Sequence, residues 1–583
     1  MEAQTKTCQN CKKDFTIEPD DFAFYEKMKV PAPTFCPECR LMRKMTWRNE
    51  RTLYKRNCGK CGKQIVSIYP TESPFVVYCQ DCWWSDSWDP MATGAIYNFS
   101  RPFMTQFVGL LQQTPSVALF NTTPSNSDYC NYMSGARNCY LQLAGRESEE
   151  ILYSNRIYMC KDSADCYTGT RNERCYQCIQ CENSFNLKYS QYCDTCVDSN
   201  FLFDCRNCQN CSFSTNLRGK QYYLFNRPYT KEEYFLKLKE FDFGSYKVMQ
   251  DCIKKFDELR ATALRKYAQM IKTSQSTGDN LKNSKNCKEC FDFSGDNYED
   301  CAYSHYIGIG LKDSYDVYGL SRGERLYESL SLGFESTENA NYMFSQVVKG
   351  STNIFYSLNC TGSHDLFGCT GLRSKQYCIL NKQYTKEEYE ELLPKIIEHM
   401  NAQPYIDKRG RIYKYGEFFA PELSPFAYNE TIAQEYFPLS KEEAEKQGYS
   451  WKDSDKRAYN VTKTAEQLPD NIKNVDDSIF AETIQCLHNQ KCNEQCTQAF
   501  KIIPQELQFY KKMNLPLPRL CPNCRHYQRL VQRNPLKLWH RQCMCDKNHA
   551  HHTGKCTNEF ETPYAPDRPE IVYCEQCYQQ EVI

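Results

Sequence analysis

The residues of this chain whose type and spacing could do chemistry are cysteines, which gather in close pairs near both ends. Near each end two such pairs stand about 25 residues apart, and the second pair reads Cys-Pro-x-Cys-Arg. A tetrahedral zinc ion needs four soft ligands held by two rigid turns, and this spacing supplies them. We therefore predict a structural zinc ion in each of two quartets: Cys8, Cys11, Cys36 and Cys39, and Cys492, Cys496, Cys521 and Cys524.

A further group of cysteines follows each quartet. The N-terminal group is Cys58, Cys61, Cys79 and Cys82. The C-terminal group repeats its 18-residue step with Cys556, Cys574 and Cys577 but leaves the fourth ligand open. Cys543 or Cys545 could complete a four-cysteine site, and one of His549, His551 and His552 could instead complete a site of three cysteines and a histidine. We expect about four zinc ions in all, with a structural role, because protein fills every position of such a site.

Basic residues follow the second cysteine pair of each terminal quartet at a spacing of four. They are Arg40, Lys44 and Arg48 at one end, and Arg525, Arg529 and Arg533 at the other. This spacing places each trio along one face of a helix, which the proline of Cys-Pro-x-Cys would begin. With aromatic residues nearby, each trio could contact phosphates while rings stack on bases. The alternatives are that the trios balance the charge of the neighbouring thiolates or contact a protein partner.

The composition separates this chain from two other classes of protein. Aromatic residues make up 14% of the 583 positions, which is too many for a disordered chain. The 37 cysteines would suit a secreted disulfide scaffold, but we find no signal-peptide pattern and no apolar run long enough to span a bilayer. We expect a cytoplasmic protein with no membrane partner. Because the formal net charge is zero, local basic patches would have to hold any RNA or DNA.

Two β-rich units in the centre must position these terminal modules. Strand-like segments recur every 10–15 residues over 128–229 and again over 286–384, which predicts a solenoid or a sandwich. Both units close with Leu-Arg-x-Lys-Gln-Tyr and continue into Tyr-Thr-Lys-Glu-Glu-Tyr, where Thr230 and Thr385 start helices with capping boxes. We favour right-handed β-solenoids, because asparagine and cysteine recur together at the apparent corners. A pair of β-sandwiches is the alternative.

The fold class that follows is multidomain and mainly β with helices, with zinc modules at both termini around a duplicated centre. The remaining segments are double zinc modules at 1–100 and 481–583, a linker at 101–127, a helical segment at 230–285 and a helical or irregular connector at 385–480. The central cysteines, such as Cys175 and Cys205, should pack inside the solenoid as small apolar side chains. Further metal binding and redox chemistry are the alternatives for them.

The segment from Cys8 to Lys44 resembles the bacterial probable zinc-ribbon domain, which is similar to a treble clef, in its cysteine pairs and its Phe-Tyr dipeptide. Cys492 to Arg529 resembles it too, with three residues instead of two inside the first pair. The resemblance implies that both quartets bind zinc. The whole arrangement is similar to uncharacterised bacterial proteins in which zinc ribbons flank a cysteine-rich repeat region, which implies metal binding and no particular activity.

No catalytic motif accompanies these cysteines: the sequence has no phosphate-binding loop, nucleophile elbow or paired metalloprotease histidines. The first hypothesis is a non-enzymatic multi-zinc binding protein whose basic helices contact nucleic acid. The second is a protein-interaction scaffold in which the zinc modules are structural caps. The third is a carbohydrate-active β-solenoid enzyme, which would need a cluster of carboxylates lining a groove.

Overall fold

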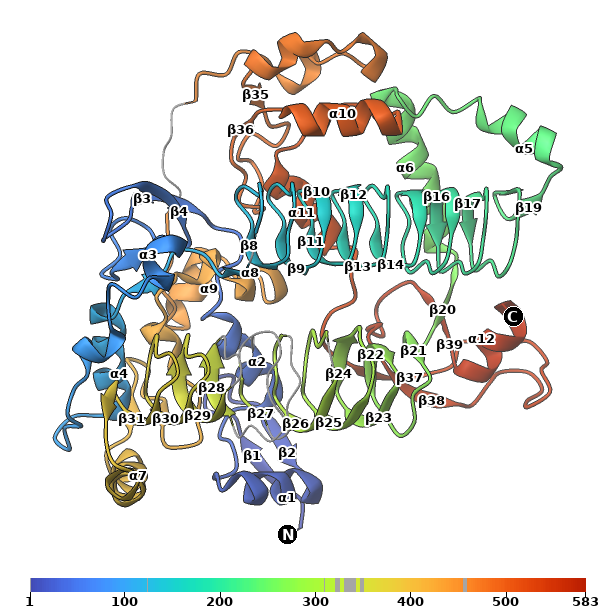
Figure 1. The fold of residues 1–583 in the computed structure, drawn as a ribbon. Helices are drawn as coiled ribbons and strands as arrows, with labels where there is room; N and C mark the ends of the chain where they lie inside the picture. Colours follow the sequence, from blue (N-terminus) through green and yellow to red (C-terminus); the bar gives the residue numbers. More distant parts are fainter. Residues whose placement is uncertain are drawn as a thin grey trace.

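The computed structural model describes residues 2–122, 124–308, 310–319, 326–329, 342–346, 351–453 and 459–582. Its centre consists of two β-solenoids that lie side by side, and the chain runs along them in opposite directions (Figure 1). The modules from both ends of the chain lie around this pair. The sequence prediction of a mainly β, multidomain protein with a solenoid centre is confirmed.

The first solenoid is built from coils of 12 residues. Parallel pairing joins Asn155 to Tyr167 and Tyr167 to Ile179, an advance of 12 residues each time. Its strands are β7 (Asn121–Thr122), β8 (Asn131–Ser134), β9 (Leu143–Arg146), β10 (Glu149–Leu152), β11 (Asn155–Tyr158), β12 (Lys161–Ala164), β13 (Tyr167–Thr170), β14 (Ile179–Glu182), β15 (Phe185–Lys188), β16 (Val197–Phe203), β17 (Ser212–Thr215) and β18 (Tyr223–Leu224).

The backbone explains how so short a coil closes. From Asn126 to Phe225 every third residue has a positive φ, near the left-handed helical region, so the chain turns after each three residues. Asparagine adopts this conformation more readily than most residues, and Asn138 and Asn207 stand at such corners. The Nδ2 of Asn126 donates to the Oδ1 of Asn138, 2.8 Å away and one coil further along. Stacked corners of this kind exclude the sandwich alternative for this unit.

The interior of the first solenoid is narrow and is filled largely by cysteine. These side chains are Cys130, Cys139, Cys160, Cys166, Cys175, Cys178, Cys181, Cys193, Cys196, Cys205, Cys208 and Cys211, and all are buried. Their thiols point at backbone carbonyls; the Sγ of Cys193, for example, lies 3.3 Å from the oxygen of Gln191. All 37 cysteines of the chain are free thiols. These cysteines pack in the interior of the first solenoid as small buried side chains, as expected from the sequence.

The second solenoid has less regular coils. The pairing advances by 12 residues from Gly278 to Cys290, but by 14 from Cys287 to Cys301. Its strands are β21 (Met270–Ile271), β22 (Gly278–Lys282), β23 (Ser284–Lys288), β24 (Cys290–Phe293), β25 (Tyr298–Ala302), β26 (Leu311–Tyr315), β27 (Leu326–Tyr327), β28 (Tyr342–Gln346), β29 (Thr352–Leu358), β30 (His364–Phe367) and β31 (Gln376–Ile379).

Both solenoids end in the same way. A short antiparallel strand closes each last coil: β19 (Arg227–Pro228) pairs with β18, and β32 (Lys382–Gln383) pairs with β31. Helices α5 (Lys231–Leu238) and α7 (Lys386–Ala402) follow, each with the capping box predicted from Thr230 or Thr385. Helix α6 (Tyr246–Ala261) packs on the first solenoid. The connector after α7 holds β33 (Tyr405–Ile406), β34 (Ile412–Tyr413), α8 (Ile432–Tyr436) and α9 (Lys441–Lys446).

Four small terminal modules share one plan, a strand pair followed by a helix. The N-terminal elements are β1 (Gln4–Thr7), β2 (Asp14–Ile17), α1 (Pro19–Met28), α2 (Pro37–Met45), β3 (Tyr54–Asn57), β4 (Gln64–Ser67), β5 (Val77–Tyr78) and α3 (Gln80–Trp84), after which α4 (Phe103–Gln113) and β6 (Ser116–Val117) lead into the first solenoid. The C-terminal elements are β35 (Ile484–Gln485), β36 (Ala499–Phe500), α10 (Pro504–Met513), α11 (Pro522–Leu530), β37 (Trp539–Gln542), β38 (Glu559–Thr562), β39 (Ile571–Tyr573), which pairs with β20 (Leu264–Lys266), and α12 (Glu575–Val582). No helix within the described ranges is both long and apolar enough to cross a membrane.

Candidate metal centres

Each of the four terminal modules brings four cysteine sulfurs together. The groups are Cys8, Cys11, Cys36 and Cys39; Cys58, Cys61, Cys79 and Cys82; Cys486, Cys496, Cys521 and Cys524; and Cys543, Cys556, Cys574 and Cys577. Within each group the four sulfur atoms lie within 4.8 Å of one another. Each group could therefore hold a metal ion, as the sequence analysis expects for both ends.

The distances fit a tetrahedral ion. The separation between Sγ atoms is 3.8 Å for Cys11 and Cys36 and 3.9 Å for Cys61 and Cys79. An ion with four bonds to sulfur of about 2.3 Å would hold its ligands about 3.8 Å apart. The four groups also share one backbone contact, in which the third cysteine donates its N–H to the sulfur of the first. These N–H donors are Cys36, Cys79, Cys521 and Cys574, and the acceptors Cys8, Cys58, Cys486 and Cys543 lie 3.2–3.3 Å away.

Backbone donors prepare the sulfurs for metal. Burial raises the pKa of the Cys58 thiol, but N–H groups of Cys61, Cys79 and Lys60 point at its sulfur and lower the pKa to about 6. A metal ion needs the thiolate, so a thiol with this pKa gives up its proton readily near neutral pH. The second cysteine pair of each module adds a helix N-terminus: Cys36 and Cys521 are the N-caps of α2 and α11, where the helix dipole favours negative charge.

The third group differs from the sequence prediction in one ligand. Its first cysteine is Cys486, at the end of β35, whereas the sequence analysis chose Cys492. The loop from Cys486 to Cys496 is seven residues longer than the loop from Cys8 to Cys11, so Cys486, and not the nearer Cys492, is the counterpart of Cys8. The Sγ of Cys492 nevertheless lies 3.8 Å from the Sγ of Cys524, beside the group. The spare cysteine upstream was the signal that could have revealed the longer loop.

The fourth group resolves the open ligand of the last module. Cys543 joins Cys556, Cys574 and Cys577, while Cys545 lies in a neighbouring group with His549, His552 and the same Cys577. The sequence predicted that Cys543, Cys545 or one of the histidines would be the fourth ligand of a single site. In the structure they take different positions around Cys577.

The basic residues that follow the first N-terminal quartet are not exposed. Arg40 is 1% exposed, and its guanidinium binds the carboxylate of Asp316 through Nε and Nη2 at 3.0 and 2.9 Å. The Nζ of Lys44, which is 0% exposed, donates to the same carboxylate at 3.2 Å. Asp316 directly follows β26 of the second solenoid. Helix α2 is thus clamped to that solenoid by a buried cluster of two cations and one anion.

The C-terminal counterpart makes a similar cluster on the other solenoid, in which Arg525 also pairs with Glu506 at 3.2 Å. Nη1 of Arg525 and Nη1 of Arg529 each donate to Asp165, which directly follows β12, at 2.8 Å. Arg525 and Arg529 stand 485 positions after Arg40 and Lys44. The surrounding tyrosines match too. The hydroxyl of Tyr153 donates to Glu506, and the hydroxyl of Tyr303 donates to Asp21, which stands 485 positions before Glu506.

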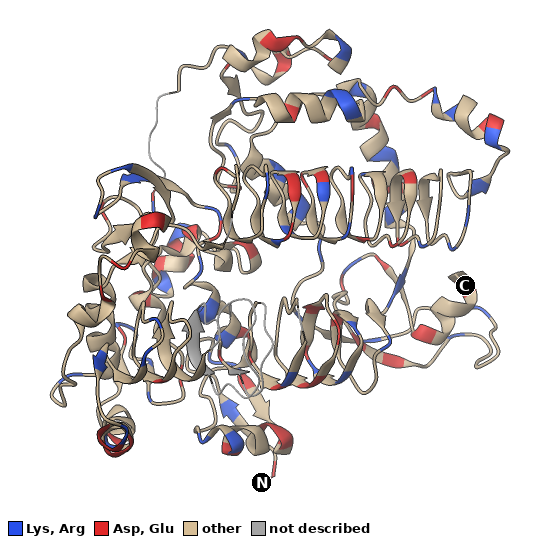
Figure 2. Cartoon of the chain, in the orientation of Figure 1, with Lys and Arg blue, Asp and Glu red and all other residues tan. Residues whose placement is uncertain are grey.

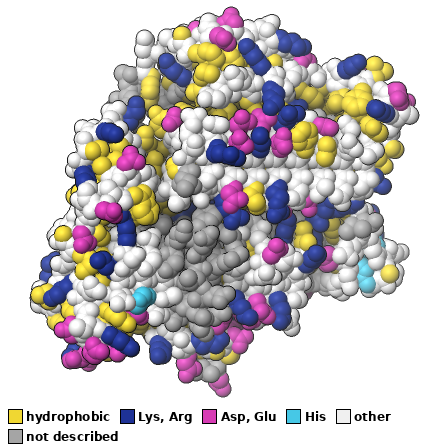
Figure 3. All heavy atoms as spheres, viewed as in Figure 1, with side chains coloured by type: hydrophobic (Ala, Val, Ile, Leu, Met, Phe, Trp, Pro, Cys, Tyr) yellow, Lys and Arg dark blue, Asp and Glu magenta, His cyan; other side chains and the backbone are white. Residues whose placement is uncertain are grey.

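The last pair of predicted phosphate contacts is also engaged inside the protein. Nε of Arg48 donates to Glu50 at 2.6 Å, and its guanidinium lies 3.7 Å from the ring centre of Tyr132. Arg533 stacks on Tyr436 at 3.6 Å and is half-buried. Five of the six predicted side chains are thus buried and Arg533 is half-buried, so in this fold they are engaged by protein groups and are not free to face nucleic acid. Elsewhere, basic and acidic residues are intermixed along the elements and on the face shown (Figures 2 and 3).

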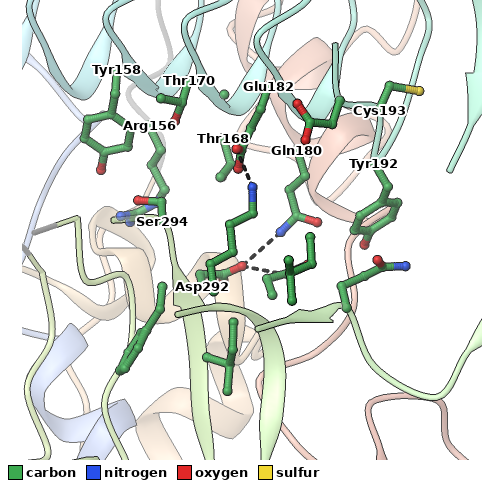
Figure 4. A pocket seen from close by; sticks show the side chains of 18 of the residues that line it. Arg156, Tyr158, Thr168, Thr170, Gln180, Glu182, Tyr192, Cys193, Asp292 and Ser294 are labelled. Carbon is green, nitrogen blue, oxygen red and sulfur yellow. Dashed lines mark hydrogen bonds and ion pairs between the residues drawn. The ribbon is translucent and has the colours of Figure 1, made fainter. Parts of the chain in front are cut away.

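A pocket lies between the two solenoids, with a volume of about 800 Å3, part of it open to solvent. Side chains from β11, β13 and β14 face others from β22 and β24 (Figure 4). Gln180 reaches across to Asp292, with Nε2 donating to the carboxylate at 2.9 Å, and Lys282 pairs with Glu182. These contacts join β14 of the first solenoid to β22 and β24 of the second.

The pocket does not present a free pair of carboxylates. Asp292 already accepts from Gln180 and Asn280, and Lys282 neutralises Glu182. Burial raises the pKa of the Asp292 carboxyl. The carbohydrate-active hypothesis asks for a cluster of carboxylates lining a groove, and here Asp292 and Glu182 are instead each engaged by the contacts that join the solenoids.

Comparison with known proteins adds little. No protein-family description matches the chain, and no curated protein matches it. Among solved structures, a putative acetyltransferase from Desulfovibrio desulfuricans G20 matches 50% of this chain and 86% of its own, at 9% identity and a TM-score of 0.10. A TM-score this low supports no conclusion about fold or activity.

Proposed function

We propose that this protein is a non-enzymatic scaffold in which structural zinc ions hold four small modules, and the modules clamp two β-solenoids into one body. The observation that carries the proposal is the duplicated cluster at Asp316 and Asp165. Helices α2 and α11, which each begin at a cysteine pair, insert two cations onto one solenoid aspartate. The basic residues thereby act within the protein, where they connect metal site and solenoid.

Zinc is the ion that suits these modules best. Four thiolates complete a tetrahedral shell and leave no open position for water or substrate, which is the pattern of a structural site. The modules are also too small for a core of their own, since each holds only a strand pair and one or two helices. In such modules, metal binding supplies folding free energy on the order of 10 kcal/mol. A module without its ion would then lose the geometry that places its helix on the solenoid.

Hydrogen exchange on the full chain tests this link between metal and solenoid. Cys11→Ser removes one ligand of the first site, and we expect it to lower zinc content by one ion and to speed exchange in β26, next to Asp316. Cys252→Ser is the matched control, because Cys252 is a buried cysteine of α6 that belongs to none of the four quartets. Unchanged exchange in β26 after loss of the ion would contradict the clamp.

Filter binding to RNA and to DNA over a salt series tests the nucleic-acid hypothesis directly. We expect at most weak binding without a steep dependence on salt, because the six predicted contacts are paired inside the protein. Tight binding with a steep salt slope would require another basic surface and would overturn the assignment as a scaffold alone.

A further inference from the structure

The loop between β37 and β38 places a second set of ligand atoms beside the last four-cysteine group. Cys545, His549, His552 and Cys577 each bring one sulfur or ring nitrogen to within 4.8 Å of the others. Cys577 is also the fourth member of the neighbouring cysteine group. We propose that this module binds two zinc ions and that the thiolate of Cys577 bridges them. The inference rests on the proposed function, which supplies the first of the two ions.

His552 is oriented as a ligand. Its Nε2 faces the Sγ of Cys577 at 3.1 Å, and a shift of a few tenths of an ångström would bring the two atoms to the separation of about 3.5 Å that one tetrahedral zinc ion sets for a nitrogen and a sulfur. Its Nδ1 lies 2.8 Å from the backbone oxygen of Gly554. A carbonyl can only accept, so Nδ1 carries the proton and the lone pair of Nε2 faces the sulfur. Zinc-binding histidines are commonly held by such a second hydrogen bond.

His549 has a buried nitrogen that lacks a hydrogen bond. Its side chain is only 7% exposed, and Nε2 has no hydrogen-bond partner among the described residues, although a carboxylate oxygen of Glu581 lies 3.5 Å away. A buried polar atom without a partner is costly, and a metal ion would offset that cost. Cys545, the remaining member, is fully buried (0% exposed). A buried thiol near two imidazoles and a thiolate is a suitable ligand environment for zinc.

Charge also favours the second ion. One zinc ion on four thiolates leaves the group at roughly −2. A second zinc ion that adds one thiolate, from Cys545, and two neutral imidazoles brings the pair to roughly −1. Because these sulfurs are buried, the reduction in uncompensated negative charge stabilises the module.

Elemental analysis of purified full-length protein tests the bridged pair. Cys545→Ser, or His549→Ala with His552→Ala, should lower the zinc content by one ion per chain relative to the parent protein. Cys577→Ser should lower it by two, which is the signature of a bridging ligand. His551→Ala tests the choice of histidines, because Nε2 of His551 also lies 3.3 Å from the Sγ of Cys577; if His549 and His552 are the ligands, its removal should leave the zinc content unchanged.

The outcomes separate this inference from the proposed function. Loss of a single ion in Cys577→Ser, or no loss in the histidine double variant, would overturn the proposed second site. Neither result would contradict the proposal that the four-cysteine groups bind zinc. Loss in His551→Ala but not in the double variant would overturn the ligand set. A parent protein with no bound zinc would overturn the proposed function itself. Circular dichroism of each variant shows whether the module remains folded. If a variant does not fold, Co2+ spectra of the parent protein still distinguish sulfur-only from mixed sulfur–nitrogen coordination.

Discussion

At the scale of single residues, two aspartates decide how the terminal modules meet the solenoids. Asp316 and Asp165 both lie at corners with a positive φ, directly after a strand, so their carboxylates project from the coil toward the docked helix. Each receives two cationic side chains in a buried setting. Burial raises the pKa of the Asp316 carboxyl, but attraction to Arg40 and Lys44 outweighs it and holds the pKa below its usual value.

Removing one of these charges should be strongly destabilising. Asp316→Asn leaves Arg40 and Lys44 buried without their anion, and we expect a loss of about 3–5 kcal/mol in the free energy of unfolding. Denaturant titration followed by tyrosine and tryptophan fluorescence measures it. Glu299→Gln is the control, because Glu299 pairs with Lys285 and Lys312 at the surface, where such pairs contribute little. A similar shift in both variants would contradict the role assigned to the clamp.

Acid sensitivity should depend on His305. Burial, with a smaller contribution from Lys44, lowers the pKa of this histidine to about 3, against about 6.5 in an unfolded chain. As pH falls from about 6.5 to 3, the unfolded chain takes up a proton that the folded one refuses, so stability is lost across this window, by about 4–5 kcal/mol at its end.

His305→Phe should move the midpoint of acid unfolding to lower pH, because the variant has no proton to take up. The ring should still stack on Phe291, whose centre lies 5.5 Å from that of His305. Acid titration by circular dichroism gives the midpoint. His364→Phe, at a half-exposed position, should leave it unchanged; equal shifts in the two variants would contradict burial as the cause.

At the scale of elements, the first solenoid depends on its backbone corners. A left-handed residue at every third position lets a 12-residue coil close on itself, and small cysteine side chains fill the narrow space inside. Some corner side chains, such as Phe201 and Phe213, are buried against neighbouring aromatic rings; at an exposed corner, by contrast, the backbone conformation is the main constraint. This explains why asparagine, aspartate and glycine are frequent there.

A substitution at an exposed corner isolates that backbone requirement. Asn207 has a φ of 52° and an exposed side chain. We expect Asn207→Val to destabilise the solenoid by about 1–2 kcal/mol, since a β-branched residue is strained in this region. Asn207→Gly should cost much less. The comparison of thermal unfolding in the two variants is the measurement, and a glycine variant that is as unstable as the valine variant would show that the side chain matters instead.

At the scale of the whole molecule, the clamps are crossed. The N-terminal module is docked on the second solenoid and the C-terminal module on the first, although each lies nearer in sequence to the other solenoid. The solenoids themselves meet through Gln180 with Asp292 and Glu182 with Lys282. Crossing makes each chain end depend on the opposite half, so the protein should fold as one unit.

Refolding should therefore require metal. Protein unfolded in denaturant and diluted with zinc and reductant should recover the near-ultraviolet circular dichroism of its buried tyrosines, whereas dilution into a chelator should not. The physical reason is that modules without ions cannot place α2 and α11 against Asp316 and Asp165. Full recovery of the signal in chelator would contradict a structural role for the ions.

Local sequence patterns predict the paired cysteines, the duplicated solenoids and the capped helices after them. Ligand spacing, coil period and capping boxes each depend on residues that lie within a few tens of positions of one another. Packing alone decided the rest. From the sequence, Arg40 and Arg525 are expected to be exposed helical residues, but a solenoid covers each of them. Whether Cys486 or Cys492, and Cys543 or Cys545, joins a four-cysteine group depends on how a loop bends back in space. Burial depends on two surfaces that come into contact, so the sequence of one segment does not determine it.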